Sequence, residues 1–371
     1  MKVTEELKAI VAFSLLENMG PIAFKRLLET FGSVSKILKV PENKLKSFRG
    51  KHAIDYSVLK SKRLFEMAEE EIKKASSQGV EIISRLDKRY PAALKEIHDP
   101  PILLYVKGRL PSESVVKVAV VGSRIASLYG MRTAETISRG LAEAGVAVVS
   151  GMAVGIDGAA HQGALSADGV TIAVLGGGLS RLYPHENKKM AQDIVKKGAV
   201  ISEYPMEMAP RPAYFPIRNR IISGLSSAVL VVEAKEKSGA LITVDLALEQ
   251  GRDVFAVPGN VDSARSGGTN SLLKQGAKLA VSAEDILEEL DIKKSSVAAR
   301  KEKHNGGSRV ANLSEEENKL LSLIDSEPAH VDSLIEYSGV PASKTIAALS
   351  LLEIKGFLKQ LPGKHYVKTH A

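Results

Sequence analysis

The chain has 371 residues, enough for two or three domains at roughly 150 residues each. Its formal net charge of +8 favours a polyanionic partner only weakly, because the excess is spread over the whole chain. The absence of cysteine excludes disulfides, thiolate catalysis and thiolate-bound zinc or iron–sulfur centres.

The ends of the chain and its hydropathy bear on its compartment. The segment Met1–Glu6 lacks the basic region of a secretory signal peptide. No apolar run approaches the roughly 18 residues that span a bilayer. We therefore expect a soluble, cytoplasmic protein without membrane partners.

Residues 1–85 are predicted to be helical, because apolar residues recur with a period near 3.6. Asn18–Arg26 is similar to a helix-hairpin-helix turn, in which backbone amides and Lys25 or Arg26 would face a nucleic-acid phosphate. The residues Phe48–Lys51 are a weaker second candidate. One glycine turn is a weak motif, so a helical packing module with solvated lysines is the favoured interpretation.

Residues 86–291 are predicted to form a doubly wound α/β domain. Prolines near residue 100 exclude a long helix there, and Ile102–Val106 reads as a strand. From about residue 113, continuous β-branched runs alternate with helix-like stretches. Continuous apolar strands are buried on both faces, as in a mostly parallel Rossmann-like sheet.

Two further segments follow the α/β region. Residues 292–311 are polar, basic and aperiodic, which predicts a flexible linker. Residues 312–371 show three helical stretches and a strand pair around Pro362-Gly363, the pattern of a winged helix. Its third helix, Ser343–Lys355, carries few basic residues, so protein contact or packing is at least as plausible as DNA reading.

Glycines recur where the predicted parallel strands end. The turns are Gly122-Ser-Arg124, Ser150-Gly151 with Gly155, Gly176–Gly178, Lys237-Ser-Gly239 and Pro258-Gly259. Because parallel strands end at one edge of a sheet, these turns predict an extended anion-binding surface. The Gly-Ser-Arg turn does not match a dinucleotide fingerprint, and no P-loop motif is present.

Two other groups of residues leave alternatives open. Asp157 and His161 are spaced i, i+4; they suit an acid–base pair, but a structural role is favoured and no third metal ligand is evident. The segment Tyr204–Arg220 combines arginines with Tyr214 and Phe215, as single-stranded nucleic-acid grooves do. Alternatively these arginines pair with Glu203 or Glu233 in a buried loop, and both readings can hold together.

These motifs together resemble the DNA-processing protein A family (DprA/Smf) over about residues 90–290. The matching motifs include Val121–Arg124, Ser150–His161, Tyr183-Pro184, Phe215–Gly224 and Val254–Gly259. The resemblance implies an extended Rossmann-like domain that binds single-stranded DNA and forms a homodimer. It also implies protection of incoming DNA and loading of the RecA recombinase during natural transformation, without catalysis, cofactor or metal.

The motifs and the resemblance together predict thirteen DNA-binding residues. They are Gly122, Ser123, Arg124, Gly151, Gly155, Gly177, His185, Phe215, Arg218, Asn219, Arg220, Ser238 and Gly239. Some family members have a basic residue after the Tyr-Pro pair; here that position is His185, which leaves its contact sensitive to pH.

Two alternative functions are considered. The fold also resembles nucleotide phosphoribohydrolases, although Lys237–Thr243, with Glu249 downstream, lacks two glycines and the proline of their loop. A protein-interaction adaptor acting through the winged helix is the other alternative.

Overall fold

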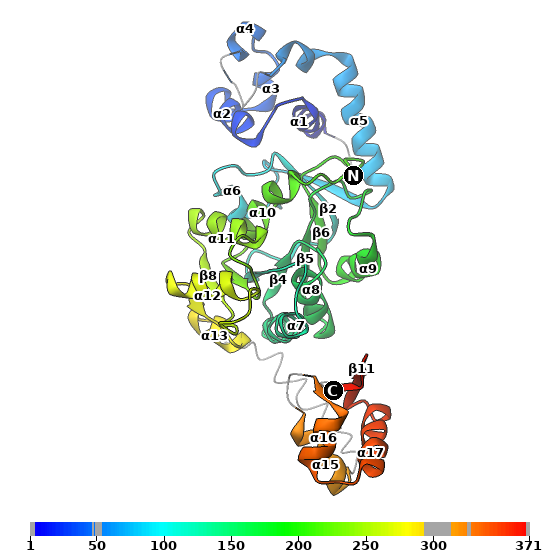
Figure 1. The fold of residues 1–371 in the computed structure, drawn as a ribbon. Helices are drawn as coiled ribbons and strands as arrows, with labels where there is room; N and C mark the ends of the chain where they lie inside the picture. Colours follow the sequence, from blue (N-terminus) through cyan, green and yellow to red (C-terminus); the bar gives the residue numbers. More distant parts are fainter. Residues whose placement is uncertain (1–3, 47, 49–53, 293–312, 325–327, 369–371) are drawn as a thin grey trace. The chain divides into compact units, whose positions relative to one another are not determined.

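The computed structural model describes residues 4–46, 48, 54–292, 313–324 and 328–368. The chain divides into two compact units, Met1–Ser295 and Ser296–Ala371 (Figure 1). All but one residue of the predicted linker 292–311 lie outside the described residues, so the linker and the domain boundaries stay predictions.

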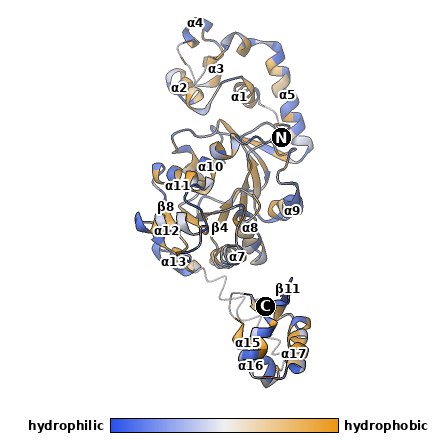
Figure 2. Cartoon of the chain, viewed as in Figure 1, coloured by the Kyte–Doolittle hydropathy of each residue, from blue (hydrophilic) through white to orange (hydrophobic). Residues whose placement is uncertain are grey.

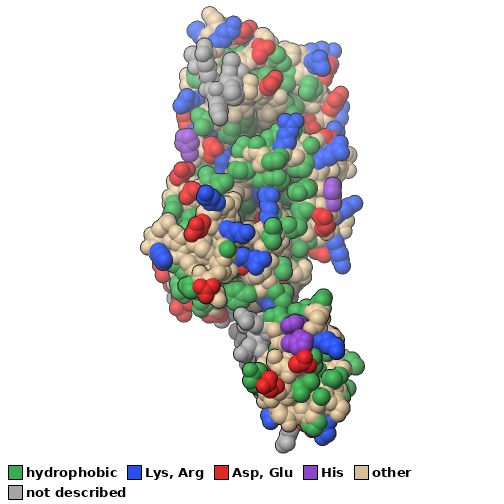
Figure 3. Space-filling view, viewed as in Figure 1, with side chains coloured by type: hydrophobic (Ala, Val, Ile, Leu, Met, Phe, Trp, Pro, Cys, Tyr) green, Lys and Arg blue, Asp and Glu red, His purple; other side chains and the backbone are tan. Residues whose placement is uncertain are grey.

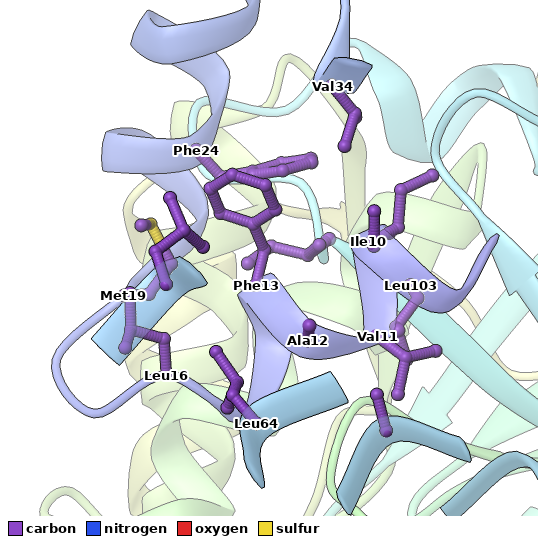
Figure 4. Packing of buried hydrophobic residues seen from close by; sticks show 14 of the residues in the cluster. Ile10, Val11, Ala12, Phe13, Leu16, Met19, Phe24, Val34, Leu64 and Leu103 are labelled. Carbon is purple, nitrogen blue, oxygen red and sulfur yellow. The ribbon is translucent and has the colours of Figure 1, made fainter. Parts of the chain in front are cut away.

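The first unit begins with a helical region. Its helices are α1 (Glu5–Leu15), α2 (Pro21–Phe31), α3 (Val34–Ile37), α4 (Glu42–Leu45), the 3-10 helix η1 (Tyr56–Lys60) and α5 (Lys62–Ser77). The Thr4 side chain caps α1 by accepting from the Leu7 amide, and Gly32 ends α2 at φ +80°, which suits glycine. Phe13 and Phe24 pack in the centre with ring centroids 5.4 Å apart (Figure 4). The apolar residues that recur with a helical period in the sequence thus pack into one buried core of this region.

A nine-stranded sheet forms the body of the first unit, in the order β1-β2-β6-β5-β4-β3-β7-β8-β9. The strands are β1 (Val80–Ser84), β2 (Leu103–Gly108), β3 (Lys117–Val121), β4 (Ala147–Ser150), β5 (Thr171–Val174), β6 (Ala199–Ser202), β7 (Ala228–Val231), β8 (Asp253–Ala256) and β9 (Lys278–Leu279). In the sheet order, all neighbouring strands from β6 through β5, β4, β3, β7 and β8 to β9 are parallel. Strand β2 pairs antiparallel with β1 and β6. The helical prediction for 1–85 is therefore wrong at β1.

Helices cover both faces of this sheet. They are α6 (Ala92–Lys95), α7 (Leu128–Glu143), α8 (Ile156–Ser166), η2 (His185–Asn187), α9 (Lys188–Lys197), α10 (Tyr214–Leu225), α11 (Gly239–Glu249), α12 (Gly267–Lys274) and α13 (Ala283–Glu289). On β3, Val118 and Val120 join a core with α7, α8 and α13, whereas Ala119 and Val121 join a core with α10 and α11. Figure 2 shows the hydrophobic strands between the helices. The doubly wound α/β prediction is confirmed.

The second unit is a winged helix. It contains α15 (Glu315–Leu323), β10 (Ala329–His330), α16 (Val331–Ser338), α17 (Ala342–Ile354), β11 (Leu358–Leu361) and β12 (His365–Lys368), with strand order β10-β12-β11. On α17, Ile346, Leu351 and Ile354 are 49%, 50% and 82% exposed, and Lys344 pairs with Glu316. The surface of this third helix is thus more apolar than basic. None of the described helices is long and apolar enough to cross a membrane.

Candidate nucleic-acid interface

The ends of β3 and β7 meet the starts of α10 and α11 around a cavity of about 600 Å³. We call it the β3–α10 pocket. The predicted residues among its lining are Gly122, Ser123, Arg124, Phe215, Arg218, Asn219, Ser238 and Gly239. The lining also includes Tyr183, Lys235 and Lys237, which were not predicted as DNA-binding. A strand end followed by two lysines could have signalled Lys235 and Lys237.

Arg124 projects into this pocket from the turn after β3. Its side chain is exposed, and its guanidinium carbon lies 4.9 Å from the centroid of the Phe215 ring. Phe215 in turn lies 6.0 Å from the Tyr183 ring centroid. A guanidinium stacked on an aromatic face keeps its charge while its orientation is restricted. The positive group predicted at the Gly-Ser-Arg turn is therefore positioned before any ligand arrives.

The predicted close approach at the glycines exists, but its partner is the protein itself. A Cβ on Gly151 would lie 1.8 Å from Nη1 of Arg218, and one on Gly122 would lie 2.6 Å from Ile156. Gly155 has φ +82°, and its Cβ would lie 2.4 Å from the Ser123 carbonyl oxygen. These glycines let strand ends and Arg218 pack closely.

The remaining two glycines differ from each other. A Cβ on Gly177 would meet Pro210 at 3.1 Å, whereas one on Gly239 would meet nothing within 4 Å. Of the predicted glycines, only Gly239 therefore leaves open space beside its backbone. Five of the predicted DNA-binding residues do not line the β3–α10 pocket: Gly151, Gly155, Gly177, His185 and Arg220.

At two of the strand-to-helix turns, backbone amides already donate hydrogen bonds to carboxylates of the protein itself. At α7, the Ser127 amide and hydroxyl donate to the Glu233 carboxylate at 2.8 and 2.7 Å. At α8, the Asp157 carboxylate accepts from the amides of Gly151 and Ala153 at 3.2 and 3.4 Å. The α7 start thus carries an internal anion, contrary to the expectation of a site for an external one. The start of α11, capped by Ser238, lies at the pocket.

Arg218 provides a buried positive charge in the lining of the pocket. Its side chain is 3% exposed, and Nη1 donates to the Val174 carbonyl at 2.8 Å. Burial lowers the pKa of Arg218 to about 10, against the opposing effect of Asp157, so the group stays charged at neutral pH. Its Nε has no hydrogen-bond partner within the described part of the chain. Such a cation is stabilised by an anion in the pocket.

Arg220 has a different environment, although it lies only two residues further on. Nε donates to Asp99 at 2.9 Å, while Nη1 and Nη2 each donate to a Glu203 oxygen at 2.7 Å. Burial opposes ionisation, but Glu203 and then Asp99 raise the pKa of Arg220 above its ordinary value. Of the alternatives left open, Arg220 takes pairing with Glu203. All three guanidinium nitrogens of Arg220 thus donate within the protein, a geometry that favours a positioning role over direct contact with DNA.

Asp157 is largely buried but belongs to the lining of the β3–α10 pocket, whereas His161 is fully buried. Thr171 donates its hydroxyl proton to the Val148 carbonyl. His161 Nδ1 lies 2.7 Å from the Thr171 hydroxyl oxygen and is therefore the donor in that hydrogen bond. Burial, followed by the charge of Arg218, lowers the pKa of His161 to about 3. Burial also raises the pKa of Asp157. A neutral histidine in a hydrogen-bonded core position fits the structural alternative.

The neutral state of His161 predicts a loss of stability on mild acidification. With an ordinary pKa of 6.5 and a folded pKa of about 3, the unfolded chain takes up a proton that the folded chain does not. The free energy of unfolding should therefore decrease as the pH drops below 6.5. At pH 5 it should be about 2 kcal/mol lower than at pH 7.5. Urea denaturation from pH 7.5 to 5 checks this.

The matched control for that experiment is His161→Gln. The difference between the wild-type and variant stabilities cancels the other titrating groups, Asp157 included. That difference should shrink by about the same 2 kcal/mol between pH 7.5 and 5. A difference that is independent of pH would show that His161 is not held neutral.

His185 lies away from the pocket lining. It starts η2, is exposed, and has its ring centroid 6.5 Å from that of Tyr183. Among the described residues, no group of three or more histidine and carboxylate side chains could hold a metal ion. The DNA-binding role of each predicted residue stays a prediction.

Comparisons with known proteins show what this chain is similar to. Residues 81–291 match the family model described as DNA recombination-mediator protein A, and residues 308–364 match the DprA winged helix domain. The protein Smf of Escherichia coli is 40% identical over 275 residues, which are 74% of each chain. The DNA processing protein DprA of Bacillus subtilis is 46% identical over 214 residues, 57% of this chain and 72% of the relative.

Two solved structures extend the comparison. The X-ray structure of DNA processing protein A from Streptococcus pneumoniae superposes with a TM-score of 0.63 at 38% identity, covering 78% of this chain and 99% of that one. The second is DNA processing protein A from Helicobacter pylori, whose structure is described as showing its single-stranded DNA binding mode. It gives a TM-score of 0.52 at 30% identity, covering 58% of this chain and 97% of that one.

Proposed function

Because this chain belongs to the family of DNA recombination-mediator protein A, we propose that it binds single-stranded DNA in the β3–α10 pocket and acts as a recombination mediator. The observation that carries the proposal is the pair formed by Arg124 and Arg218. One is exposed and stacked on Phe215, and the other is buried in the same lining. The relative from Helicobacter pylori, whose binding of single-stranded DNA is described, supports the choice of ligand.

The chemistry of the pocket rim fits a phosphate backbone with unstacked bases. Lys235, Lys237 and Arg124 supply positive charge, and Phe215 and Tyr183 supply ring faces. Single-stranded nucleic-acid grooves combine these two features. On the face drawn in Figure 3, Lys and Arg side chains lie among hydrophobic ones over the middle of the first unit.

The direct test is a fluorescence anisotropy titration of labelled single-stranded DNA, with duplex DNA of the same length as competitor. We expect preferential binding of the single strand and an affinity that falls steeply as salt rises. Equal affinity for duplex, or no binding at low salt, would contradict the proposal.

The finer function is proposed on the same basis. We propose that the chain acts in the cytoplasm as a homodimer, protects incoming single strands and loads RecA onto them during natural transformation. Exposed apolar side chains on α11, including Leu248, are available to a second copy. RecA filament assembly on DNA already covered by a single-strand-binding protein tests loading, and light scattering after size exclusion tests the dimer.

We propose no catalytic step for this chain. The hydrolase alternative predicts release of a base from a nucleoside monophosphate. A loop with the sequence of Lys237–Thr243, which lacks two motif glycines and the proline, does not favour that reaction. Base release that depends on Glu249 would overturn this part of the proposal.

A further inference from the structure

A second groove, of about 1000 Å³, lies between the α1–α2 turn and the loop that precedes α10. Both sides belong to the first compact unit. The groove lining includes Leu15, Met19, Ile22, Arg26, Tyr204, Tyr214, Ile217 and Arg220. The two sides are held together by a shared core, and the Met206 amide donates to the buried Glu71 carboxylate of α5 at 2.6 Å. We call this cavity the α2–α10 groove.

The lining of the α2–α10 groove combines aromatic rings with positive charge. Tyr204 and Tyr214 are stacked, with ring centroids 4.5 Å apart and planes 23° apart. Arg211 is not part of the lining, but its guanidinium carbon lies 5.9 Å from the Tyr214 ring centroid. Neither Arg211 nor Arg26 forms an ion pair with a described residue, whereas Asp99 and Glu203 both bind the single guanidinium of Arg220. Both carboxylates are therefore engaged with Arg220, and the cations without an ion pair to a described residue are Arg26 in the lining and Arg211 beside it.

The predicted helix-hairpin-helix turn contributes its cation rather than its first amides. The amides of Met19 and Gly20 donate within the turn, to Leu16 and Asn18 carbonyls at 3.1 and 3.0 Å. Arg26, one of the two cations named in the sequence motif, is exposed and lines the groove. Its charge is therefore the group available to a phosphate.

Helix α10 places the α2–α10 groove next to the β3–α10 pocket. Tyr214 and Ile217 line the groove, while Phe215 and Arg218 line the pocket. Residues three apart share one side of a helix, so the first turn of α10 is a ridge with an aromatic residue facing each cavity. A DNA strand that leaves the pocket across this ridge would enter the groove.

We propose that the α2–α10 groove is a second subsite for the same DNA strand, which takes bases against the Tyr204–Tyr214 pair and phosphate at Arg26 and Arg211. This inference rests on the proposed function of the pocket. Stacked aromatic rings flanked by cations recognise unpaired bases with little sequence preference.

The test uses the full-length chain and labelled oligodeoxythymidylates of about 6 and about 20 nucleotides, since a single binding fold contacts roughly 4–16 nucleotides. Tyr214→Leu should weaken binding of the long oligonucleotide by roughly five-fold or more, as expected from the loss of one stacked base. Binding of the short one should not change. Arg26→Glu should weaken only the long complex and reduce its salt dependence by about one phosphate contact.

Arg63→Glu is the matched control, because Arg63 is an exposed arginine of α5 that lines neither cavity. It should leave both complexes unchanged. Equal binding of the long oligonucleotide by wild type, Tyr214→Leu and Arg26→Glu would overturn the subsite and leave the groove to a protein partner. A wild-type chain that binds neither oligonucleotide would instead overturn the proposed function together with the subsite.

A second readout does not depend on the folding of variants. Photocrosslinking of the wild-type chain to a long oligonucleotide with 5-iododeoxyuridine should modify Tyr204 or Tyr214. The short oligonucleotide should react only around the β3–α10 pocket, where Tyr183 and Phe215 lie. Crosslinks confined to the pocket with both lengths would contradict the second subsite.

Discussion

Arg124→Ala is expected to weaken single-stranded DNA binding by roughly 10- to 100-fold, because a hydrogen bond to a charged group contributes about 1.5–3 kcal/mol. The side chain is exposed, stacked on Phe215 at 4.9 Å, and shares the pocket lining with Arg218. Its removal leaves the fold intact, since the turn itself is held by the Ser123 amide bound to the Glu233 carbonyl at 2.8 Å. Titrations at two salt concentrations measure the loss.

Two variants accompany this experiment. Arg124→Lys keeps the charge but loses the planar fork, so it should retain part of the affinity. Arg63→Ala removes one exposed positive charge far from the pocket lining and should bind as wild type does. If Arg124→Ala and Arg63→Ala weaken binding equally, net charge rather than the pocket governs the affinity.

Arg220→Ala is expected to destabilise the folded chain by about 3–5 kcal/mol, the usual result of removing one partner of a buried ion pair. Arg220 is 3% exposed and holds Glu203 and Asp99, whose side chains are 13% and 36% exposed. Without it, Glu203 stays largely buried with no compensating charge. Chemical denaturation at neutral pH measures the effect.

The control for Arg220 is Arg89→Ala. Arg89 also contacts two carboxylates, Glu81 and Asp87, but its side chain is 53% exposed. Exposed ion pairs contribute about 0–1 kcal/mol, so this variant should unfold close to wild type. If Arg220→Ala were equally stable and lost only DNA affinity, Arg220 would be a direct DNA contact and its positioning role would be wrong.

The sequence determined the type of fold because burial leaves a periodic record. Runs such as Val118–Val121 are apolar at every position, which happens only when both faces of a strand are covered. The winged helix and the α/β region followed from such patterns. Val80–Ser84 was missed because a strand of five residues next to a long helix gives little periodicity, and its pairing partner, Leu103–Gly108, lies further along the chain.

Sequence also predicted where the candidate site lies, because parallel strands end at a common edge and Gly122-Ser-Arg124 follows one of them. What the glycines face was decided by tertiary structure. A missing Cβ shows only that something is close, and at Gly151 that neighbour is Arg218 rather than a ligand. Tyr183 joins the pocket from a segment distant in sequence, which no local pattern reveals.

Arg218 and Arg220 show most directly what sequence leaves undecided. They lie in one motif and have one side-chain chemistry, yet residues two apart on a helix face different sides. Tertiary packing gives Arg220 two carboxylates from Asp99 and Glu203, whereas Arg218 hydrogen-bonds only a carbonyl and has Asp157 as an opposite charge in the same pocket lining. The sequence thus determined which residue types meet at this edge of the sheet. Only the packing of distant segments decided which charge is already neutralised and which is available to a ligand.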